Sequence, residues 1–338
     1  NILGEKGKFL SENLEVLISF YNNDPISVEL PNQINCKVET TDVALKGQTV
    51  SSSYKPATLH NGVKIQVPPF IESGDDIVVD TRTIEYVKKV WIMNSISPNL
   101  NIMIKACEKA SKILKRDFGE VENLQVSTKG PRDFVTNSDK KVEKTLIEEL
   151  LKYKKKFSVI SEETKLIENS DKDNFWIIDP IDGTTNFLHG IPHFAISIAL
   201  RFRNEILSGI VFDPIKDEIF FAEKNNGAYF NNHRVRVSKK NKLDECLFAT
   251  NSKGIKVSGL NSRITGSAAL DLAYVGAGRF DGYFQNNLNL WDIAAGALIV
   301  EEAGGAISDI DYSKTENINV RASSNNIYSK MNEKISNF

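Results

Sequence analysis

The sequence contains few cysteines and few histidines, and neither residue type is spaced as a metal ligand. Its 338 residues include three cysteines (Cys36, Cys107 and Cys246) that lie far apart without a CxxC pair. The four histidines form no cluster with metal-ligand spacing. Scattered thiols are typical of core residues in a reducing compartment, so the pattern excludes a disulfide framework and a structural zinc site.

A long apolar run and a large excess of charge are also missing. No stretch approaches the ~20 apolar residues needed to cross a bilayer, and the first residues show no signal-peptide pattern. The net charge of -2 argues against a general polyanion binder. A hydrophobic content of 41% is sufficient for sizeable packed cores. We therefore expect a soluble cytoplasmic protein with more than one domain.

Residues 1–92 show short β-type runs separated by turn residues. Two of these runs flank Asn22-Asn23-Asp24-Pro25, which predicts a β-hairpin. We expect strands in this segment at 16–20, 26–30, 35–40, 63–67 and 76–81. Several short strands at such spacing indicate a small all-β barrel, for which the five-stranded OB type is the best match in size.

The same segment resembles the C-terminal OB domain of elongation factor P. The resemblance runs from about Leu14 to Lys88 and rests on Lys55-Pro56-Ala57-Thr58, Asn61-Gly62, 67–71, 79–82 and Tyr86. Residues 1–13 resemble the end of the preceding domain in that family. The family's N-terminal domain, which carries a modified lysine, has no counterpart, so the resemblance does not imply the activity of the whole factor.

OB barrels often bind oligonucleotides, which makes RNA or ribosome contact one interpretation of this segment. Acidic residues are interleaved with its basic and aromatic ones, at Asp75, Asp76 and Asp80 among others. This mixed charge favours the alternative, a structural role for the aromatic side chains in the barrel core and a solvated rim of charges.

Residues 90–95 join this segment to a second one. Met93 falls near the start of the part of the chain that resembles a second family, so it looks like a former start codon. We therefore hypothesise that the chain is a fusion of two neighbouring reading frames. The expected domains are therefore 1–92 and 93–338.

The most informative stretch of the second segment is Asp-Pro-Ile-Asp-Gly-Thr-Thr-Asn-Phe at 179–187. It follows the apolar run 175–178, so Asp179 and Asp182 are expected where a buried strand ends in a turn. Pro180 fixes one backbone angle, and Gly183 lets the backbone approach a ligand closely. Carboxylate oxygens are ligands that Mg²⁺ selects, and a phosphate can complete the coordination. An isolated Asp-Gly pair, in contrast, is more often a surface turn.

As a whole, the nine-residue string resembles the metal-binding motif of the inositol monophosphatase family of Mg²⁺-dependent, lithium-sensitive phosphatases. The resemblance covers about residues 98–328 and includes Ser161-Glu162-Glu163, Trp291-Asp292 and Gly304-Gly305. It implies an α/β layered sandwich of the inositol monophosphatase/fructose-bisphosphatase type, usually a homodimer.

The resemblance also implies the site residues. The metal ligands for two or three Mg²⁺ would be Glu162, Asp179, Ile181 (through its carbonyl), Asp182 and Asp292. Thr184, Glu162 and Asp139 would position the attacking water. The substrate contacts would be Ile181, Asp182, Gly183, Thr184, Arg263, Gly266, Ser267, Ala268, Gln285 and Asp292. Four carboxylates that converge without cations would repel one another and raise each other's pKa values, so the set requires metal.

Each of these residues also has a simpler interpretation. Asp139 and Asp292 are ordinary residues for a helix N-terminus, and Glu162-Glu163 could be surface charge. From Arg263 to Ala269 we expect the opening of a helix whose free amides face an anionic ligand.

Two departures from the family pattern bear on the substrate. Gln285 stands where family members that act on inositol commonly carry Glu, and the segment 251–262 is shorter than usual, as if one surface helix were deleted. The expected substrate is myo-inositol monophosphate. The alternatives are another sugar or nucleotide phosphate, such as fructose bisphosphate or phosphoadenosine phosphate, or an RNA- or ribosome-associated role without catalysis.

Overall fold

The structure is a computed structural model, and it describes residues 4–11, 14–41, 54–69, 71–90, 96–120, 126–130, 133–231, 233–251 and 260–335. The chain divides into two compact units, Asn1–Asn94 and Ser95–Phe338, each of which is described by itself. Met93 and most of the short loop 251–262 lie outside the described residues. The described residues contain no helix that is both long and apolar enough to cross a membrane.

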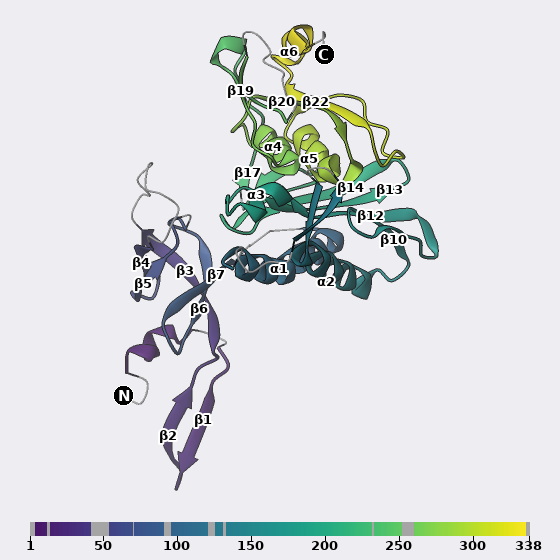
Figure 1. Cartoon of the computed structure of the whole chain (residues 1–338). Coiled ribbons are helices and arrows are strands. Elements are labelled where there is room, and N and C mark those ends of the chain that lie inside the picture. The colour runs from purple at the N-terminus through teal and green to yellow at the C-terminus, as the bar shows by residue number, and fades with distance from the viewer. Residues whose placement is uncertain are drawn as a thin grey trace. The chain divides into compact units, whose positions relative to one another are not determined.

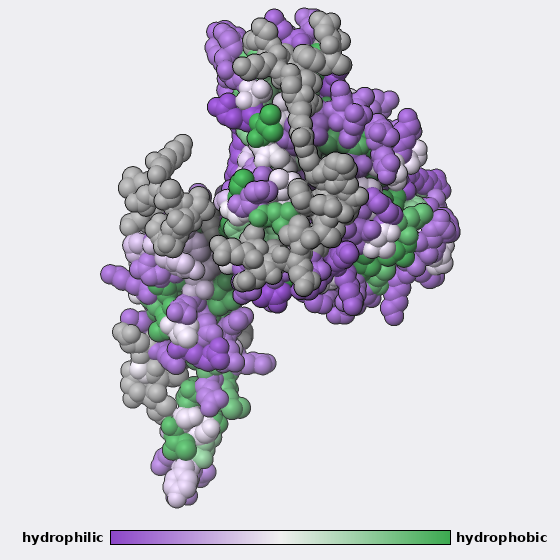
Figure 2. Space-filling model, viewed as in Figure 1, coloured by the Kyte–Doolittle hydropathy of each residue, from purple (hydrophilic) through white to green (hydrophobic). Residues whose placement is uncertain are grey.

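The first unit begins with a 3-10 helix, η1 (Gly4–Phe9), and a separate hairpin of β1 (Leu17–Tyr21) and β2 (Asp24–Glu29). The hairpin confirms the prediction from Asn22-Asn23-Asp24-Pro25, and both asparagines have a positive φ. Its large apolar side chains are exposed, and Figure 2 shows hydrophobic surface along it. The hairpin is therefore a sheet of its own and contributes no strand to the five-stranded sheet that follows.

That sheet has the strand order β5-β4-β3-β6-β7 among the described residues. Its strands are β3 (Gln33–Thr41), β4 (Lys55–Leu59), β5 (Lys64–Val67), β6 (Asp76–Asp80) and β7 (Glu85–Val90). The outer strands β5 and β7 contact each other, which closes the sheet around a core of Val38, Leu59, Val67, Ile71, Ile77 and Val79. The unit is all-β and has a five-stranded sheet, as expected. Two of the five predicted strands form the separate hairpin instead, and the sheet contains β4 and β7, which were not predicted.

The second unit is built in layers, as Figure 1 shows. Helices α1 (Pro98–Phe118) and α2 (Asn137–Tyr153) cover one face of a large sheet. Helices α4 (Ala268–Gly276) and α5 (Leu290–Glu302) lie between that sheet and a second one, which α6 (Tyr328–Ile335) covers. The layers confirm the α/β sandwich that the resemblance implied.

The large sheet has eight described strands in the order β11-β10-β12-β13-β14-β15-β16-β17. They are β10 (Phe157–Ser161), β11 (Lys165–Ile167), β12 (Asp171–Asp182), β13 (Ala195–Phe202), β14 (Glu205–Asp213), β15 (Glu218–Glu223), β16 (Gly227–Phe230) and β17 (His233–Arg234). Strand β12 runs parallel to β10 and antiparallel to β13, so it lies inside the sheet.

The second sheet has five described strands in the order β19-β18-β20-β22-β21. They are β18 (Leu247–Ala249), β19 (Asn261–Arg263), β20 (Gly282–Leu288), β21 (Gly305–Ile307) and β22 (Ile318–Ser324). The remaining elements are the hairpin β8 (Val126–Gly130) with β9 (Asp133–Thr136), the short helix α3 (Thr184–Leu188) and the 3-10 helix η3 (Leu243–Glu245).

Arg263 is the last residue of strand β19. The prediction that a helix opens at Arg263 is wrong, because the helix begins at Ala268, after the side chain of Ser267 caps it by accepting from the amide of Leu270.

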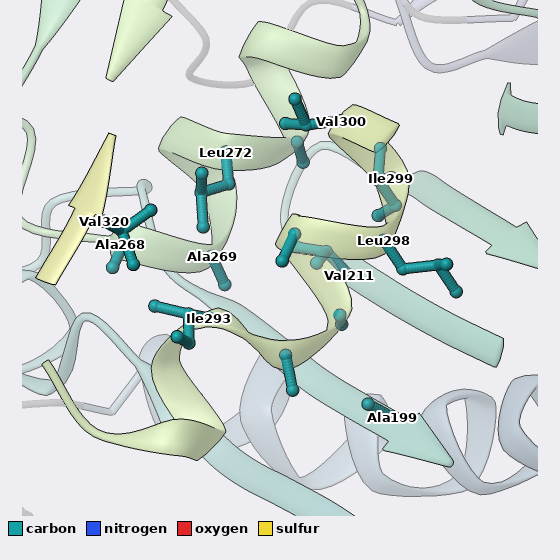
Figure 3. Close-up of a cluster of buried hydrophobic side chains, with 14 of the residues drawn as sticks. Ala199, Val211, Ala268, Ala269, Leu272, Ile293, Leu298, Ile299, Val300 and Val320 are labelled. Atoms are coloured by element: carbon teal, nitrogen blue, oxygen red, sulfur yellow. The ribbon is translucent and has the colours of Figure 1, made fainter. Parts of the chain in front are cut away.

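The core of the second unit is the contact between α4, α5 and the large sheet (Figure 3). Small residues set the separation of these layers. A Cβ on Gly209 of β14 would lie 2.9 Å from the Cα of Ala295, and one on Gly296 would lie 2.6 Å from the Cβ of Leu272 in α4. Because both helices are fixed at such close range, their N-termini are held at a defined position relative to the end of β12.

Candidate active site

Strand β12 delivers two aspartates to one end of the sheet. The strand is buried from Trp176 onward, and Asp179 and Asp182 are buried as well. The sequence had ended the strand before Asp179, but it continues to Asp182 with a register shift between the pairs Asp179–Ser197 and Asp182–Ala195. Pro180 falls within this shift, where its missing N–H breaks no regular ladder bond. The Asp179 carboxylate accepts a hydrogen bond from the amide of Ile181 at 3.0 Å.

The chain then turns sharply at Gly183 into the short helix α3. Gly183 has a φ of 99°, in the left-handed region that favours glycine. A Cβ there would lie 3.1 Å from the carbonyl oxygen of His193 and 3.2 Å from the Cβ of Phe194. Both the angle and the close neighbours therefore require glycine, as the sequence had indicated for this position.

The carboxylate of Asp182 is held at the N-terminus of α4. It accepts hydrogen bonds from the Ser267 hydroxyl, from the amide of Ala269 at 2.8 Å and from the amide of Ala268 at 3.3 Å. A helix N-terminus favours an anion because its first amides have no partner within the helix. Ser267 and Ala268, which were predicted to touch the substrate, are thus engaged with Asp182.

Asp292 lies in the first turn of α5, where the sequence had also allowed an ordinary cap. Its carboxylate accepts from the amide of Asn289 at 2.8 Å, and the two residues form a capping box. The capping interpretation is therefore correct for Asp292, and the carboxyl group is also near enough to Asp179 for its charge to raise the pKa of that residue.

Helix α2 contributes Asp139, which is fully buried. The hydroxyl of Thr184 lies 3.4 Å from its carboxylate and 3.0 Å from the carbonyl oxygen of Ile181. Two of the three residues that the resemblance assigned to the attacking water, Thr184 and Asp139, are therefore adjacent, although they are 45 positions apart in the sequence.

Glu162 follows β10, and the amide of Glu162 donates to the carbonyl of Ile178 on the neighbouring strand at 3.2 Å. The turn after it is fixed by Glu143, a buried residue one helical turn after Asp139 on α2. The carboxylate of Glu143 accepts from the amide of Glu163 at 2.9 Å, from the amide of Thr164 and from the Thr164 hydroxyl. Glu143 was not among the predicted site residues, although its i, i+4 spacing from Asp139 places both on one helix face.

Burial raises the pKa values of three carboxyl groups in this cluster, and neighbouring carboxylates add to the rise for two of them. Burial raises the pKa of Asp179 well above its usual range, and the nearby charges of Glu162, Asp182, Asp292 and Asp139 raise it further. Burial also raises the pKa of Asp292, with Asp182 and Glu162 adding to the effect. The pKa of Asp182 rises only to about 6, because the donors at the start of α4 stabilise its charged form. The repulsion that the sequence analysis expected is therefore present.

These carboxyl groups are close enough to interact but not yet spaced as ligands. In the part of the chain that the structure describes, no three or more His, Cys, Asp or Glu side chains form a group that could hold a metal ion. Asp182 and Asp292 instead direct oxygen atoms toward protein amides. The donor set nevertheless has the oxygen chemistry that Mg²⁺ prefers.

The remaining predicted contacts are less closely tied to this cluster. Gln285 is half-buried, and its side-chain oxygen accepts from the hydroxyl of Tyr283 at 2.7 Å. Arg263 is exposed, and its guanidinium donates to the carbonyl of Ser262. Gly266 is exposed, with a φ of +91°. Among the described residues, no hydrogen bond or ion pair links Arg263 to the acidic cluster.

We expect Glu143→Ala to lower the free energy of unfolding of the second unit by about 2–4 kcal/mol, because two amides and a hydroxyl lose a buried acceptor. Denaturant unfolding followed by tryptophan fluorescence measures this, since Trp176 and Trp291 are buried in that unit. Glu148→Ala, at a glutamate on the same helix with a 60% exposed side chain, is the control and should change stability by less than about 0.5 kcal/mol. Equal stability of the two variants would contradict the anchoring role of Glu143.

Comparisons with known proteins agree with this architecture. Residues 96–337 match the inositol monophosphatase family, and residues 34–89 match the C-terminal domain of elongation factor P. An inositol-1-monophosphatase from Rhizobium meliloti is 45% identical over 229 residues, which are 63% of this chain and 85% of that protein. The Nus factor SuhB of Escherichia coli K12 is 41% identical over 240 residues, 65% of this chain and 90% of that protein.

Solved structures give the same result. The extragenic suppressor protein SuhB from Bartonella henselae superimposes with a TM-score of 0.67 at 43% identity, covering 71% of this chain and 98% of that one. An inositol monophosphatase from Thermotoga maritima gives a TM-score of 0.65 at 35% identity, covering 71% and 98%. Together with the fold and the grouped carboxyl residues, these matches show that the chain belongs to the inositol monophosphatase family and carries a phosphatase unit behind a segment like the C-terminal domain of elongation factor P.

Proposed function

We propose that the second unit hydrolyses a small phosphomonoester, with myo-inositol monophosphate as the preferred substrate, and that it uses Mg²⁺. The observation that carries this proposal is the group of buried carboxyls around the end of β12, where Asp179, Asp182 and Asp292 have raised pKa values. Such a group is costly to keep unless a cation or a proton neutralises it.

The residues fit two or three Mg²⁺ ions by the chemistry of their donors. Glu162, Asp179, Asp182 and Asp292 would supply carboxylate oxygens, and Ile181 would supply its carbonyl oxygen, which already accepts from the Thr184 hydroxyl. Bound Mg²⁺ supplies Lewis-acid stabilisation of the phosphate charge and makes water a better nucleophile near neutral pH.

The chain's own groups would orient the reactants. Thr184 and Asp139 would hold the attacking water, because the Thr184 hydroxyl lies between the Asp139 carboxylate and the Ile181 carbonyl. Glu162, at the end of the adjacent strand, would complete this arrangement. The Gly183–Thr184 turn would lie against the phosphate. The water oxygen would then bond to phosphorus as the bond between phosphorus and the ester oxygen breaks, and the proton that the water gives up would balance the one that the departing oxygen takes up to become the alcohol.

The alcohol would be bound on the side of the loop before α4. Gly266 is exposed there and has no side chain to block a ligand. Gln285 has its oxygen occupied by Tyr283, so its amide can donate to a substrate hydroxyl. Ser267, Ala268 and Arg263 belong to the same stretch, with the first two acting through Asp182.

We also propose that the protein is a homodimer. Light scattering measures the molar mass in solution, which should be twice that of one chain.

A phosphate-release assay over a panel of phosphomonoesters tests the function. We expect release that depends on Mg²⁺, is inhibited by Li⁺ and has its highest kcat/KM with myo-inositol 1-phosphate. The panel includes fructose 1,6-bisphosphate and phosphoadenosine phosphate. A higher kcat/KM with either of these would replace inositol as the substrate, and no release from any panel member would refute phosphatase activity.

Asp179→Asn should abolish hydrolysis and leave the fold intact, because the amide keeps the shape of the side chain but removes the negative charge that a cation needs. The loss in kcat should be at least about a hundredfold. Asp173→Asn is the matched control on the same strand, where the carboxylate is 54% exposed and pairs with Arg203 at 3.5 Å. Turnover by Asp179→Asn at the control rate would refute the site.

RNA binding is the second candidate function, and two observations favour it. A relative of this chain is named a Nus factor. The first unit also has an open hollow of about 480 Å³, whose described lining includes Lys8, Lys37, His60, Asn35 and Asn61 but no Asp or Glu. A phosphate backbone could lie in such a basic hollow.

Filter binding of the full chain to a labelled single-stranded RNA tests this second function. We expect Lys37→Ala to weaken binding several-fold and to reduce its salt dependence, because it removes one phosphate contact. Lys64→Ala, at an exposed lysine of the same unit outside the hollow, is the control. Absence of binding at low salt would rule out RNA association through this unit.

A further inference from the structure

The side chain of Asn186, within the central motif, donates hydrogen bonds to backbone carbonyls in two separate segments of the chain. Its side chain is buried, with 8% exposure. The side-chain nitrogen donates to the carbonyl of His193 at 2.7 Å and to the carbonyl of Thr265 at 2.8 Å. The first bond closes the local turn after α3. The second spans 79 residues and reaches the loop that leads into α4.

That loop is also tied down from its other side. The hydroxyl of Thr265 donates to the carboxylate of Asp271 at 2.7 Å, and Asp271 is fully buried in α4. The amide of Gly266 donates to the side chain of Asn251 at 3.2 Å. Residues 265 and 266 are therefore held by α3, by α4 and by the segment after β18.

Packing reinforces the bond between Asn186 and the loop. Gly266 has a φ of +91°, and a Cβ there would lie 2.9 Å from the side-chain nitrogen of Asn186 and 3.1 Å from its side-chain oxygen. The amide group of Asn186 thus occupies the space that a side chain at position 266 would need. A longer or shorter side chain at 186 would either push this loop away or leave a gap beneath it.

The loop has two consequences for the site. The next residues, Ser267 to Ala269, hold the carboxylate of Asp182. The loop itself presents Gly266 toward the proposed binding side for the alcohol. Its position therefore determines both where Asp182 lies and where the substrate's alcohol group can rest.

We infer that Asn186 is a positioning residue that keeps the loop 265–268 in register with the phosphate-binding turn at Gly183, and so couples recognition of the alcohol to the hydrolytic site. This inference rests on the proposed function. Thr184 and Asn186 are two residues apart on α3, so the element that would orient the water also fixes the alcohol-binding loop.

The test compares two substrates on wild-type protein and Asn186→Ala. One substrate is the polyhydroxy phosphomonoester that the panel selects, and the other is p-nitrophenyl phosphate, whose leaving group has no hydroxyl to be recognised. We expect the ratio of their kcat/KM values to fall about three- to tenfold in the variant, the effect of one lost hydrogen bond. A purely structural defect lowers the amount of active protein, which cancels in this ratio.

Asn169→Ala is the matched control. The side chain of Asn169 also donates to a backbone carbonyl, that of Phe157, at 2.7 Å, but it lies before the start of β12 and away from the site. Its ratio should equal that of the wild type. If Asn186→Ala does not fold, Asn186→Ser, which keeps one donor, is measured in the same way and should show a smaller fall.

The outcomes separate the two proposals. If wild-type protein hydrolyses both substrates and the ratio is unchanged in the Asn186 variants, the positioning role is overturned while the proposed function stands. If wild-type protein hydrolyses neither substrate, the proposed function fails, and the role of Asn186 fails with it. A ratio that falls in the Asn186 variants but not in Asn169→Ala supports the inference.

Discussion

Mutual repulsion among buried carboxyl groups is the constraint on which the arrangement of the second unit depends. Asp139 and Asp179 lie in the interior with almost no exposure, and the charges of Glu162, Asp182 and Asp292 reach Asp179. Each negative charge taken out of water destabilises the folded chain unless donors or cations compensate for it. The surrounding elements are placed so that they can provide that compensation.

Helix N-termini provide part of it. The start of α4 donates to Asp182 through two amides and a hydroxyl, and the start of α5 holds Asp292 in a capping box. The donors at the start of α4 limit the rise in the pKa of Asp182 to about 6, whereas burial keeps the pKa values of Asp179 and of the capped Asp292 well above their usual range. A cation would therefore stabilise the charged forms of Asp179 and Asp292 most, and these two residues define the centre of the proposed site.

The packing of the layers converts this electrostatic arrangement into a fixed geometry. The acidic groups come from β12, α2, α5 and the turn after β10, which are far apart in the sequence. They meet because Gly209 and Gly296 let the sheet, α4 and α5 approach to van der Waals contact. Glu143 and Asn186 then fix the two loops that flank the cluster. Stability and chemistry thus depend on the same few contacts between layers.

Local signals in the sequence were sufficient for much of this protein. The apolar run 175–178 predicted a buried strand, and the motif 179–187 with Trp291-Asp292 predicted the family, because hydrophobic runs and short motifs are properties of neighbouring residues. The sequence did not reveal that the hairpin β1–β2 stands apart or that Asp182 rests on α4. Nor did it show that Asn186 reaches Thr265, since such contacts join residues about 80 positions apart and arise only when the layers pack.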